Sequence, residues 1–216
     1  MHFIYYFGRG LIRTLAVPFG GWKTIGRNTV SGKGPFLIVC NHLHIADPPI
    51  VAASLPLKCV IMAKEDLWQD KWSRFWVSHF GAFPVRRGGV DRESFRQAEY
   101  WLKRGVSVIM FPEGGRSRTG QIQPALPGAA LIAAHLGVPV LPVGITGTDK
   151  LRNLRKAFFH HPKITVTIGE PFVPQVPVGK LNREQRSQLM FDIMRRIAAL
   201  LPPEYRGVYG KENAPD

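Results

Sequence analysis

The chain of 216 residues has few cysteines, no repeats and no long apolar run. Cys40 and Cys59 are its only cysteines, and its start does not resemble a secretory signal with a small-residue cleavage site. We therefore expect a reducing compartment and two free thiols in the core. No uninterrupted stretch of about 20 apolar residues is present, so a membrane-spanning helix is not expected. The composition that remains is that of one globular domain.

Acidic residues are also scarce. Lys and Arg number 29 against 15 for Asp and Glu, which gives a formal net charge of +14, and no acidic residue precedes Asp47. Such an excess indicates a polyanionic partner: nucleic acid, an anionic membrane or phosphorylated small molecules. A basic nucleic-acid-binding protein is one interpretation. However, no nucleic-acid-binding module is recognisable and the basic residues are spread over many segments, so no nucleic-acid partner is expected.

The first 20 residues, "MHFIYYFGRGLIRTLAVPFG", combine aromatic and aliphatic residues with two arginines. This composition suits an amphipathic helix that lies in the interface of a bilayer. A helix packed on the protein core is the alternative. We predict an N-terminal membrane-interface helical segment over residues 1–20. The expected location is the cytoplasmic face of the cell membrane, peripheral or monotopic, with an anionic membrane surface as a partner.

Short apolar runs alternate with helical patterns along the rest of the chain. This alternation predicts the α/β class, a single domain with a mostly parallel central sheet flanked by helices. The domain is expected over residues 21–202 and a loose, polar tail over 203–216. The expected strands are 35–40, 58–63, 82–85, 106–111, 138–145 and 163–169. The expected helices are 70–81, 91–105, 128–137, 182–201 and one that begins at Pro48.

Two polar loops follow strongly apolar strands of this predicted sheet. They are "NHLHIADPP" after the strand 35–40 and "PEGGRSRTG" after the strand 106–111. In parallel α/β sheets, ligand-binding groups lie in loops at the carboxyl ends of the strands. The two loops are therefore the expected location of a functional site.

The first loop concentrates His42, His44 and Asp47, for which three chemistries come into question. The pattern does not complete a metal-binding motif, because Pro48 stands where an H-x-H-x-D-H motif has its last histidine. Neither a metal nor a cofactor is therefore expected. A nucleophile on the enzyme is disfavoured, since there is no G-x-S-x-G elbow and Cys40 ends a buried strand. Proton abstraction remains: an aspartate orients a histidine, whose ordinary pKa is about 6.5. The alternative is that Asp47 caps a helix and His42 is buried.

Arginines stand close to glycines in the second loop and in the stretch "VRRGG" at 85–89. Glycine permits close approach of the backbone, and arginine binds phosphate oxygens with two parallel hydrogen bonds. A single such loop is by default a solvated turn. Two of them beside a His/Asp loop indicate a phosphorylated substrate. The arginines concerned are Arg86, Arg87, Arg116 and Arg118.

Four blocks in this order make the chain resemble the glycerolipid acyltransferase family, which includes the lysophosphatidic acid acyltransferases. "NHLHIAD" matches the family's N-H-x-x-x-x-D, and "FPEGGRS" matches F-P-E-G-T-R-S except at Gly115. "GAFPVRRG" and "VPVLPV" are similar to the second and fourth blocks. The matches span residues 41–143, about half of the chain, and the first and third blocks together are specific.

The resemblance implies roles for individual residues. His42 would be the general base that deprotonates the acceptor hydroxyl, Asp47 would orient it, and Asn41 would hold the loop. His44 falls at a variable position of the family and is left out of catalysis. Six further residues would bind the phosphorylated acceptor or would shape and support its site. They are Arg86, Glu113, Gly114, Gly115, Arg116 and Pro142.

The reaction implied is transfer of a fatty acyl group from acyl-CoA or acyl-carrier protein to the free hydroxyl of lysophosphatidic acid, which makes phosphatidic acid. Two departures leave the acceptor open. Gly115 replaces the usual hydroxyl residue, and Leu126-Pro127 stand where relatives often carry a lysine before a glycine. Another lysophospholipid or a glycolipid is the alternative acceptor.

Overall fold

The computed structural model describes residues 10, 12, 14, 21–30, 34–79, 81–86, 92–176 and 181–210. The predicted N-terminal membrane-interface segment, residues 1–20, therefore lies outside the described residues except for three scattered positions. No helix in the described part of the chain is long and apolar enough to cross a membrane.

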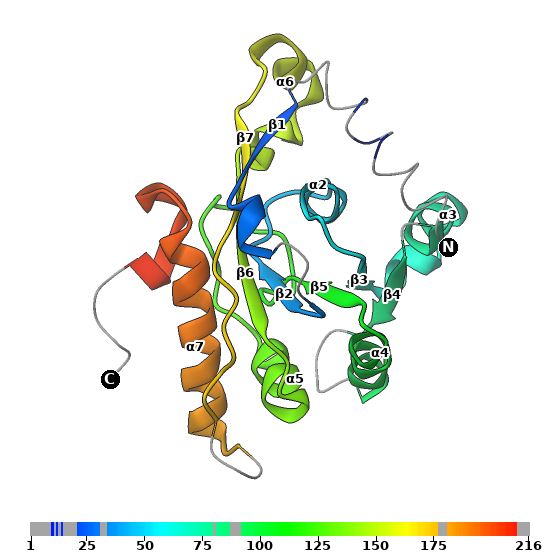
Figure 1. The fold of residues 1–216 in the computed structure, drawn as a ribbon. Helices are drawn as coiled ribbons and strands as arrows, with labels where there is room; N and C mark the ends of the chain where they lie inside the picture. Colours follow the sequence, from blue (N-terminus) through cyan, green and yellow to red (C-terminus); the bar gives the residue numbers. More distant parts are fainter. Residues whose placement is uncertain are drawn as a thin grey trace.

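A seven-stranded sheet with helices on both faces forms the body of the molecule (Figure 1). The strand order is β1-β7-β6-β2-β5-β3-β4. All neighbouring pairs are parallel except β6 and β7, which run antiparallel. The predicted α/β class with a mostly parallel sheet is confirmed. The strands are β1 (Trp22–Ile25), β2 (Leu37–Cys40), β3 (Cys59–Lys64), β4 (Ala82–Val85), β5 (Ser107–Met110), β6 (Val140–Thr146) and β7 (Ile164–Ile168).

The helices divide between the two faces of the sheet because the central strands are apolar on both sides. Leu37 and Val39 of β2 pack in one core cluster, whereas Ile38 and Cys40 pack in the other. The first cluster includes buried residues of α4, α5 and α7, and the second those of α2 and α6. The helices are α2 (Asp47–Ser54), α3 (Lys71–His79), α4 (Arg92–Lys103), α5 (Gly128–Leu136), α6 (Leu154–His160) and α7 (Arg183–Ala199).

Both cysteines are buried and free, as the sequence predicted. One strand and one α-helix were not predicted. The edge strand β1 pairs with β7, and its sequence WKTI alternates partly buried and exposed positions over one short stretch. The helix α6 has the sequence LRKAFFH, which lacks a clear apolar stripe. Neither sequence carries a strong periodic signal, so contacts with the rest of the fold decide their structure.

Residues 203–210 are ordered, and the predicted loose tail is wrong for this stretch. They form the 3-10 helices η5 (Pro203–Tyr205) and η6 (Gly207–Gly210). Tyr205 donates its hydroxyl to Asp149 Oδ1 at 3.1 Å, and the Tyr209 hydroxyl accepts from the Ala125 amide at 3.2 Å. These tyrosines tie the stretch to loops of the domain. Residues 211–216 lie outside the described part of the chain.

The strands β2, β3, β4, β5 and β6 are mutually parallel, so they all end at one edge of the sheet, here called the carboxyl edge. The loop 41–46 leaves β2 there and the loop 111–127 leaves β5. Because β2 and β5 are neighbours, the two loops that the sequence singled out lie side by side.

Candidate active site

A histidine–aspartate pair occupies the loop between β2 and α2. His42 Nδ1 lies 2.8 Å from Asp47 Oδ2. The same oxygen accepts from the backbone amides of Leu43 at 2.6 Å and His44 at 2.7 Å. The Asp47 side chain is fully buried, whereas that of His42 is 13% exposed. The chain thus folds the carboxylate back onto its own loop and leaves the imidazole partly accessible.

The contact with Asp47 sets the tautomer of His42. An ionised carboxylate only accepts hydrogen bonds, so Nδ1 carries the ring proton and Nε2 keeps its lone pair. The ring also packs against Phe111, with the two ring centroids 4.4 Å apart and the planes inclined by 32°. These two contacts fix the orientation of the imidazole, and Nε2 is left to accept a proton.

Asp47 does not cap helix α2, so that interpretation of the aspartate is wrong. The N-cap position is Ala46, which makes no side-chain capping bond, and Asp47 is the first helical residue. The three donors at Oδ2 instead come from the loop that precedes the helix. Pro48 at the next position fits the first turn, where a missing N–H costs nothing.

Glu113 joins the two loops through backbone contacts. Its Oε1 accepts from the amide of His42 at 2.7 Å and its Oε2 from the amide of Gln123 at 2.8 Å. On the other side, the amide of Ser117 donates to the carbonyl of His42 at 2.7 Å. The second loop therefore holds the backbone of His42 at both its N–H and its C=O. Sequence reasoning placed Glu113 at the acceptor site but missed this link.

Partial burial raises the pKa of Glu113 from its ordinary 4.5 to about 7, although both backbone amides favour the ionised form. Between these two values the folded protein keeps a proton that the unfolded chain has released. Stability from this group is therefore complete below pH 4.5 and is lost as the pH rises to about 7. The loss amounts to about 3 kcal/mol at most.

We expect Glu113→Gln to remove this component of the pH dependence. Urea unfolding of parent and variant at pH 5 and pH 8 measures it. The stability of the parent relative to the variant should fall by about 2–3 kcal/mol between the two pH values, since glutamine has no proton to release. The exposed Glu184→Gln serves as the control and should give no such shift. An equal difference at both pH values would contradict the expectation.

Asn41 ties the end of β2 to β6. Its Nδ2 donates to the carbonyl of Ile145 at 2.9 Å, and its Oδ1 accepts from the Ile145 amide at 2.8 Å. The side chain is 1% exposed. Pro142 lies deeper in β6, where it is buried opposite Val39 of β2. Asn41 thus anchors the loop directly, whereas Pro142 lies within the sheet that supports it.

The glycines of the second loop differ in what surrounds them. Gly114 has a φ of 67°, and a Cβ there would come 2.8 Å from Leu126 Cδ1. A Cβ at Gly115 would meet no atom within 4 Å, so the hydroxyl residue that is usual at this position would project into open space. The next residue, Arg116, is exposed. Position 114 therefore suits glycine alone, whereas Gly115 and Arg116 face solvent.

Arg86 reaches the same edge from farther away. It follows β4, which is separated from β2 by β5 and β3, or about 14 Å at the usual strand spacing. Its Nε lies 2.9 Å from Glu65 Oε2, and its side chain is 76% exposed. The structure thus places Arg86 on the carboxyl edge, at the opposite end from Asn41 and β6. The partner Glu65 was not predicted.

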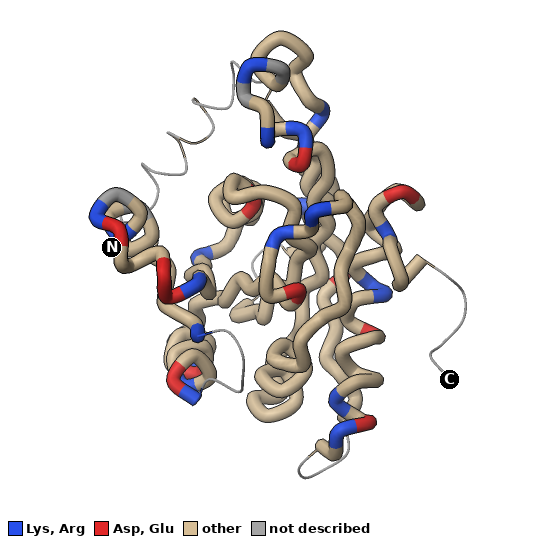
Figure 2. Tube along the Cα trace, turned by 180° about the vertical axis from the view of Figure 1, so that it is seen from behind, with Lys and Arg blue, Asp and Glu red and all other residues tan. Residues whose placement is uncertain are grey.

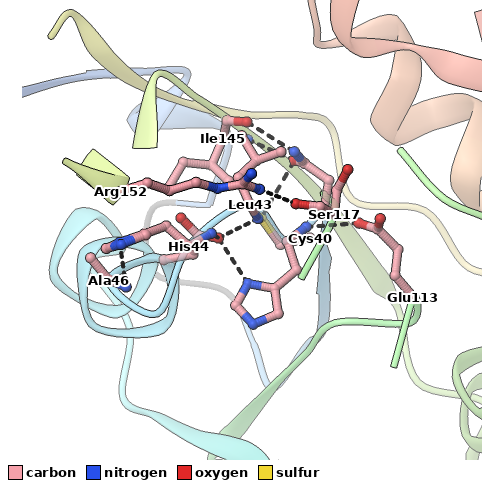
Figure 3. A network of polar contacts seen from close by, with 11 residues as sticks. Cys40, Leu43, His44, Ala46, Glu113, Ser117, Ile145 and Arg152 are labelled. Carbon is pink, nitrogen blue, oxygen red and sulfur yellow. Dashed lines mark hydrogen bonds and ion pairs between the residues drawn. The ribbon is translucent and has the colours of Figure 1, made fainter. Parts of the chain in front are cut away.

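Arg152 is a further residue of this network that sequence reasoning did not single out. It lies in the 3-10 helix η4 (Thr148–Arg152), which follows β6. Its Nη1 donates to the carbonyl of Arg118 at 3.1 Å, and its Nη2 donates to the carbonyl of Ser117. Figure 3 shows its side chain reaching toward Ser117, with His44 nearby. The only available signal was the basic stretch Lys150 to Lys163.

Neither Cys40 nor Ser117 is poised as a nucleophile. Burial, together with the charges of Asp47 and Glu113, raises the pKa of Cys40 well above its ordinary value, so its thiol stays protonated. The Ser117 hydroxyl is 1% exposed and accepts from the amide of Gly120 at 3.1 Å. Within the described ranges, no three His, Cys, Asp or Glu side chains group as metal ligands would.

His44 has a structural part in the loop. Its Nδ1 accepts from the amide of Ala46 at 3.3 Å. Burial lowers the pKa of His44, the Asp47 carboxylate opposes this effect, and the nearby Arg116 and Arg152 add to it. The neutral form of the ring, whose Nδ1 accepts the Ala46 amide, is therefore favoured and supports the turn.

Comparison with known proteins gives relatives for this arrangement. The chain is 27% identical to the 1-acyl-sn-glycerol-3-phosphate acyltransferase of Bacillus subtilis over 194 residues, which are 89% of this chain and 94% of that protein. It is 31% identical over 207 residues to a 1-acyl-sn-glycerol-3-phosphate acyltransferase of Chlamydomonas reinhardtii, with coverages of 92% and 58%. The crystal structure of the 1-acyl-sn-glycerophosphate (LPA) acyltransferase from Thermotoga maritima superposes with a TM-score of 0.66 at 27% identity, over 91% of this chain and 78% of that one.

A protein-family model described as Acyltransferase matches residues 22–146, more than half of the chain. The match includes β2, the His42–Asp47 loop and the Glu113 loop. On this match, and on the fold shared with the Thermotoga enzyme, the chain belongs to the acyltransferase family of enzymes.

Proposed function

We propose that the protein transfers a fatty acyl group from a thioester donor, acyl-CoA or acyl-carrier protein, to the free hydroxyl of lysophosphatidic acid. The product would be phosphatidic acid. The names of the relatives from Bacillus and Thermotoga support this acceptor. The observation that carries the proposal is the 2.8 Å contact between His42 Nδ1 and Asp47 Oδ2, which leaves Nε2 free to take a proton.

In the proposed reaction, His42 Nε2 takes the proton of the acceptor hydroxyl as its oxygen attacks the thioester carbonyl carbon. A C–O bond forms, the tetrahedral intermediate collapses and the C–S bond breaks. The thiolate leaves with the proton that His42 had taken, so the enzyme returns to its starting state. The buried Asp47 carboxylate stabilises the imidazolium that exists between the two proton transfers. The substrate brings its own nucleophile, and no acyl-enzyme is formed.

Cations on the carboxyl edge would bind the acceptor phosphate. Arg116 is exposed beside two glycines, and Arg86 is exposed at the end of β4. Arginine binds phosphate oxygens with charge-assisted hydrogen bonds. Arg86 would have to exchange its bond with Glu65 for the phosphate. Gly114 and Gly115 keep the second loop free of side-chain bulk near Arg116.

We expect Arg86→Gln or Arg116→Gln to weaken acceptor binding by about 1.5–3 kcal/mol, the value of a hydrogen bond to a charged group. The KM for the acceptor should therefore rise by roughly tenfold or more. The KM for the donor should stay nearly constant. The matched control is Arg96→Gln on α4, whose side chain is 77% exposed. Equal rises in the two KM values would contradict the assignment.

An acyl-transfer assay with a panel of lysophospholipids and a glycolipid acceptor, run with both donor types, tests the proposed function. Phosphatidic acid should be the main product, and a chelator should leave the rate unchanged. Transfer only to another acceptor would keep the chemistry and replace the substrate. A salt-sensitive DNA shift with no acyl transfer to any acceptor would favour a nucleic-acid-binding protein.

We also propose that residues 1–20 hold the enzyme at the cytosolic membrane surface as a peripheral or monotopic protein. Aromatic and aliphatic side chains would enter the interface, and each cation near an anionic leaflet adds about 1 kcal/mol. A version that lacks residues 1–20 should float less with anionic vesicles than the full chain. If it stays folded and floats equally, the proposal fails. If it unfolds, the segment is part of the core.

A further inference from the structure

Helix α6 exposes two adjacent aromatic rings. Phe158 is 48% exposed and Phe159 is 69% exposed. Their ring centroids lie 5.4 Å apart and the ring planes are nearly perpendicular, at 87°. Exposed large apolar side chains are ordinary when they are scattered, but adjacent ones mark a surface that contacts another apolar phase. The exposed parts of these two rings are therefore a candidate contact surface.

Basic residues outnumber acidic ones in the segment that contains this aromatic pair. Between Asp149 and Glu170 the chain contains no Asp or Glu and carries Lys150, Arg152, Arg155, Lys156 and Lys163. The side chains of Lys150, Arg155 and Lys163 are exposed. Figure 2 shows Lys and Arg positions on the turns around α6, at the top of the view. The segment 147–163, here called the lobe, therefore carries a local field that favours a polyanionic partner.

The lobe lies on the same side of the molecule as the candidate active site. It is the connection that follows β6, so it leaves the sheet at the carboxyl edge. Arg152, at the start of the lobe, donates to the carbonyls of Ser117 and Arg118 in the loop that holds the His42 backbone. Ile45, in the His42–Asp47 loop, is 61% exposed at this edge. A surface that contacts the lobe would therefore lie close to the catalytic loop.

We propose that Lys150, Arg155, Phe158, Phe159 and Lys163, named here the α6 surface, dock on an anionic membrane. The two rings would enter the interfacial region, and the cations would meet lipid phosphates. The perpendicular rings do not form the parallel platform on which successive bases stack, so nucleic acid fits less well. The inference rests on the proposed function, since a lipid acceptor held in a bilayer gives the docking its purpose. It names a second candidate membrane contact in addition to the one proposed for residues 1–20.

Vesicle flotation of the full chain tests the α6 surface without any acyl transfer. The probes are vesicles of phosphatidylcholine with phosphatidylglycerol, and vesicles of phosphatidylcholine alone. Phe158→Ser/Phe159→Ser should lower partitioning by about tenfold or more, because both rings lose their burial in the interface. The matched control is Tyr100→Ser/Val173→Ser, which removes two exposed apolar side chains, 45% and 61% exposed, on other parts of the molecule. It should stay within about twofold of the parent.

A charge variant probes the electrostatic half of the inference. Lys150→Gln/Arg155→Gln/Lys163→Gln should weaken binding to the anionic vesicles by roughly fivefold for each charge at low salt. The difference should shrink at 1 M salt, where the Debye length is about 3 Å. Binding to pure phosphatidylcholine should change far less. Equal losses on both vesicle types would contradict the role of the cations.

A labelled variant keeps the test valid if the serine variant does not fold. Cys40 and Cys59 are buried, so a thiol introduced by Phe159→Cys is the accessible one to label with an environment-sensitive fluorophore. The fluorescence should shift to the blue with anionic vesicles, whereas the same label on Tyr100→Cys should not respond. An unchanged spectrum at position 159 would overturn the proposal.

The outcomes separate this inference from the proposed function. A folded serine variant that floats as the parent does, while the chain makes phosphatidic acid, refutes the α6 surface alone. Weakened flotation in a chain that acylates no lysophospholipid refutes the proposed function alone. If the serine variant instead converts a dimer to a monomer without altering flotation, the surface is an interface between two copies and the membrane assignment is wrong.

Discussion

Replacing His42 by alanine is expected to slow acyl transfer by about 10²- to 10⁴-fold, the usual contribution of a positioned general base. The reason is geometric. Nε2 of His42 has no bond to Asp47, which is engaged by Nδ1 at 2.8 Å, and the ring is held against Phe111. Without the imidazole, the acceptor hydroxyl would lose the proposed base. Steady-state rates at saturating acceptor and donor measure the effect.

The matched control is His44→Ala, which removes the other histidine of the same loop. His44 accepts one bond from the amide of Ala46 at 3.3 Å, so its loss should cost about 1 kcal/mol of stability and little rate. Circular dichroism verifies the fold of both variants. Near-normal turnover by a folded His42→Ala protein would rule out the proposed base. Equal losses in the two variants would show that the loop, rather than the base, had been damaged.

Asp47→Ala is expected to slow acyl transfer about as much as His42→Ala does. It should also destabilise the protein. Its Oδ2 accepts from His42 and from the backbone amides of Leu43 and His44, and the side chain is fully buried. Hydrogen bonds to a charged group contribute about 1.5–3 kcal/mol, and the amides would lose their acceptor. Chemical denaturation should therefore show a loss of about 3 kcal/mol or more.

Asp47→Asn separates the charge from the geometry. The two backbone amides at the Oδ2 position require an acceptor, so the amide oxygen of asparagine should take that place. His42 then keeps its proton on Nδ1, but the negative charge that stabilises the imidazolium is gone. We expect a rate loss of roughly tenfold or more, smaller than for Asp47→Ala, since neutral hydrogen bonds are about half as strong. An Asp47→Asn enzyme with parental turnover would contradict an electrostatic role for Asp47.

Much of the fold could be predicted because the central strands are uninterrupted apolar runs that end at polar loops. Runs such as 35–40 and 106–111 became β2 and β5, and their polar ends marked the loops of the site. The edge strand β1 and helix α6 escaped prediction, since a short segment with mixed polarity takes its structure from its neighbours. Residues 203–210 look polar in sequence, yet Tyr205 and Tyr209 anchor them through their hydroxyl groups.

The sequence indicates candidate site residues but not the contacts that they make. The spacing of His42 and Asp47 indicated a turn, which the structure contains. The same spacing allowed a helix cap, and only the positions of the Leu43 and His44 amides decide against it. The link from Glu113 to the His42 backbone spans 71 residues, and that from Arg152 to Ser117 spans 35. Such links depend on which strands become neighbours, which no local pattern specifies.

Direct transfer without an acyl-enzyme is the central claim, and combined product and protein mass measurement tests it most directly. The parent chain is mixed with acyl-CoA, first without and then with lysophosphatidic acid. The account predicts no added mass on the protein in the first step, and one free thiol released for each phosphatidic acid in the second. An acylated form of the chain, or thiol release without phosphatidic acid, would contradict it.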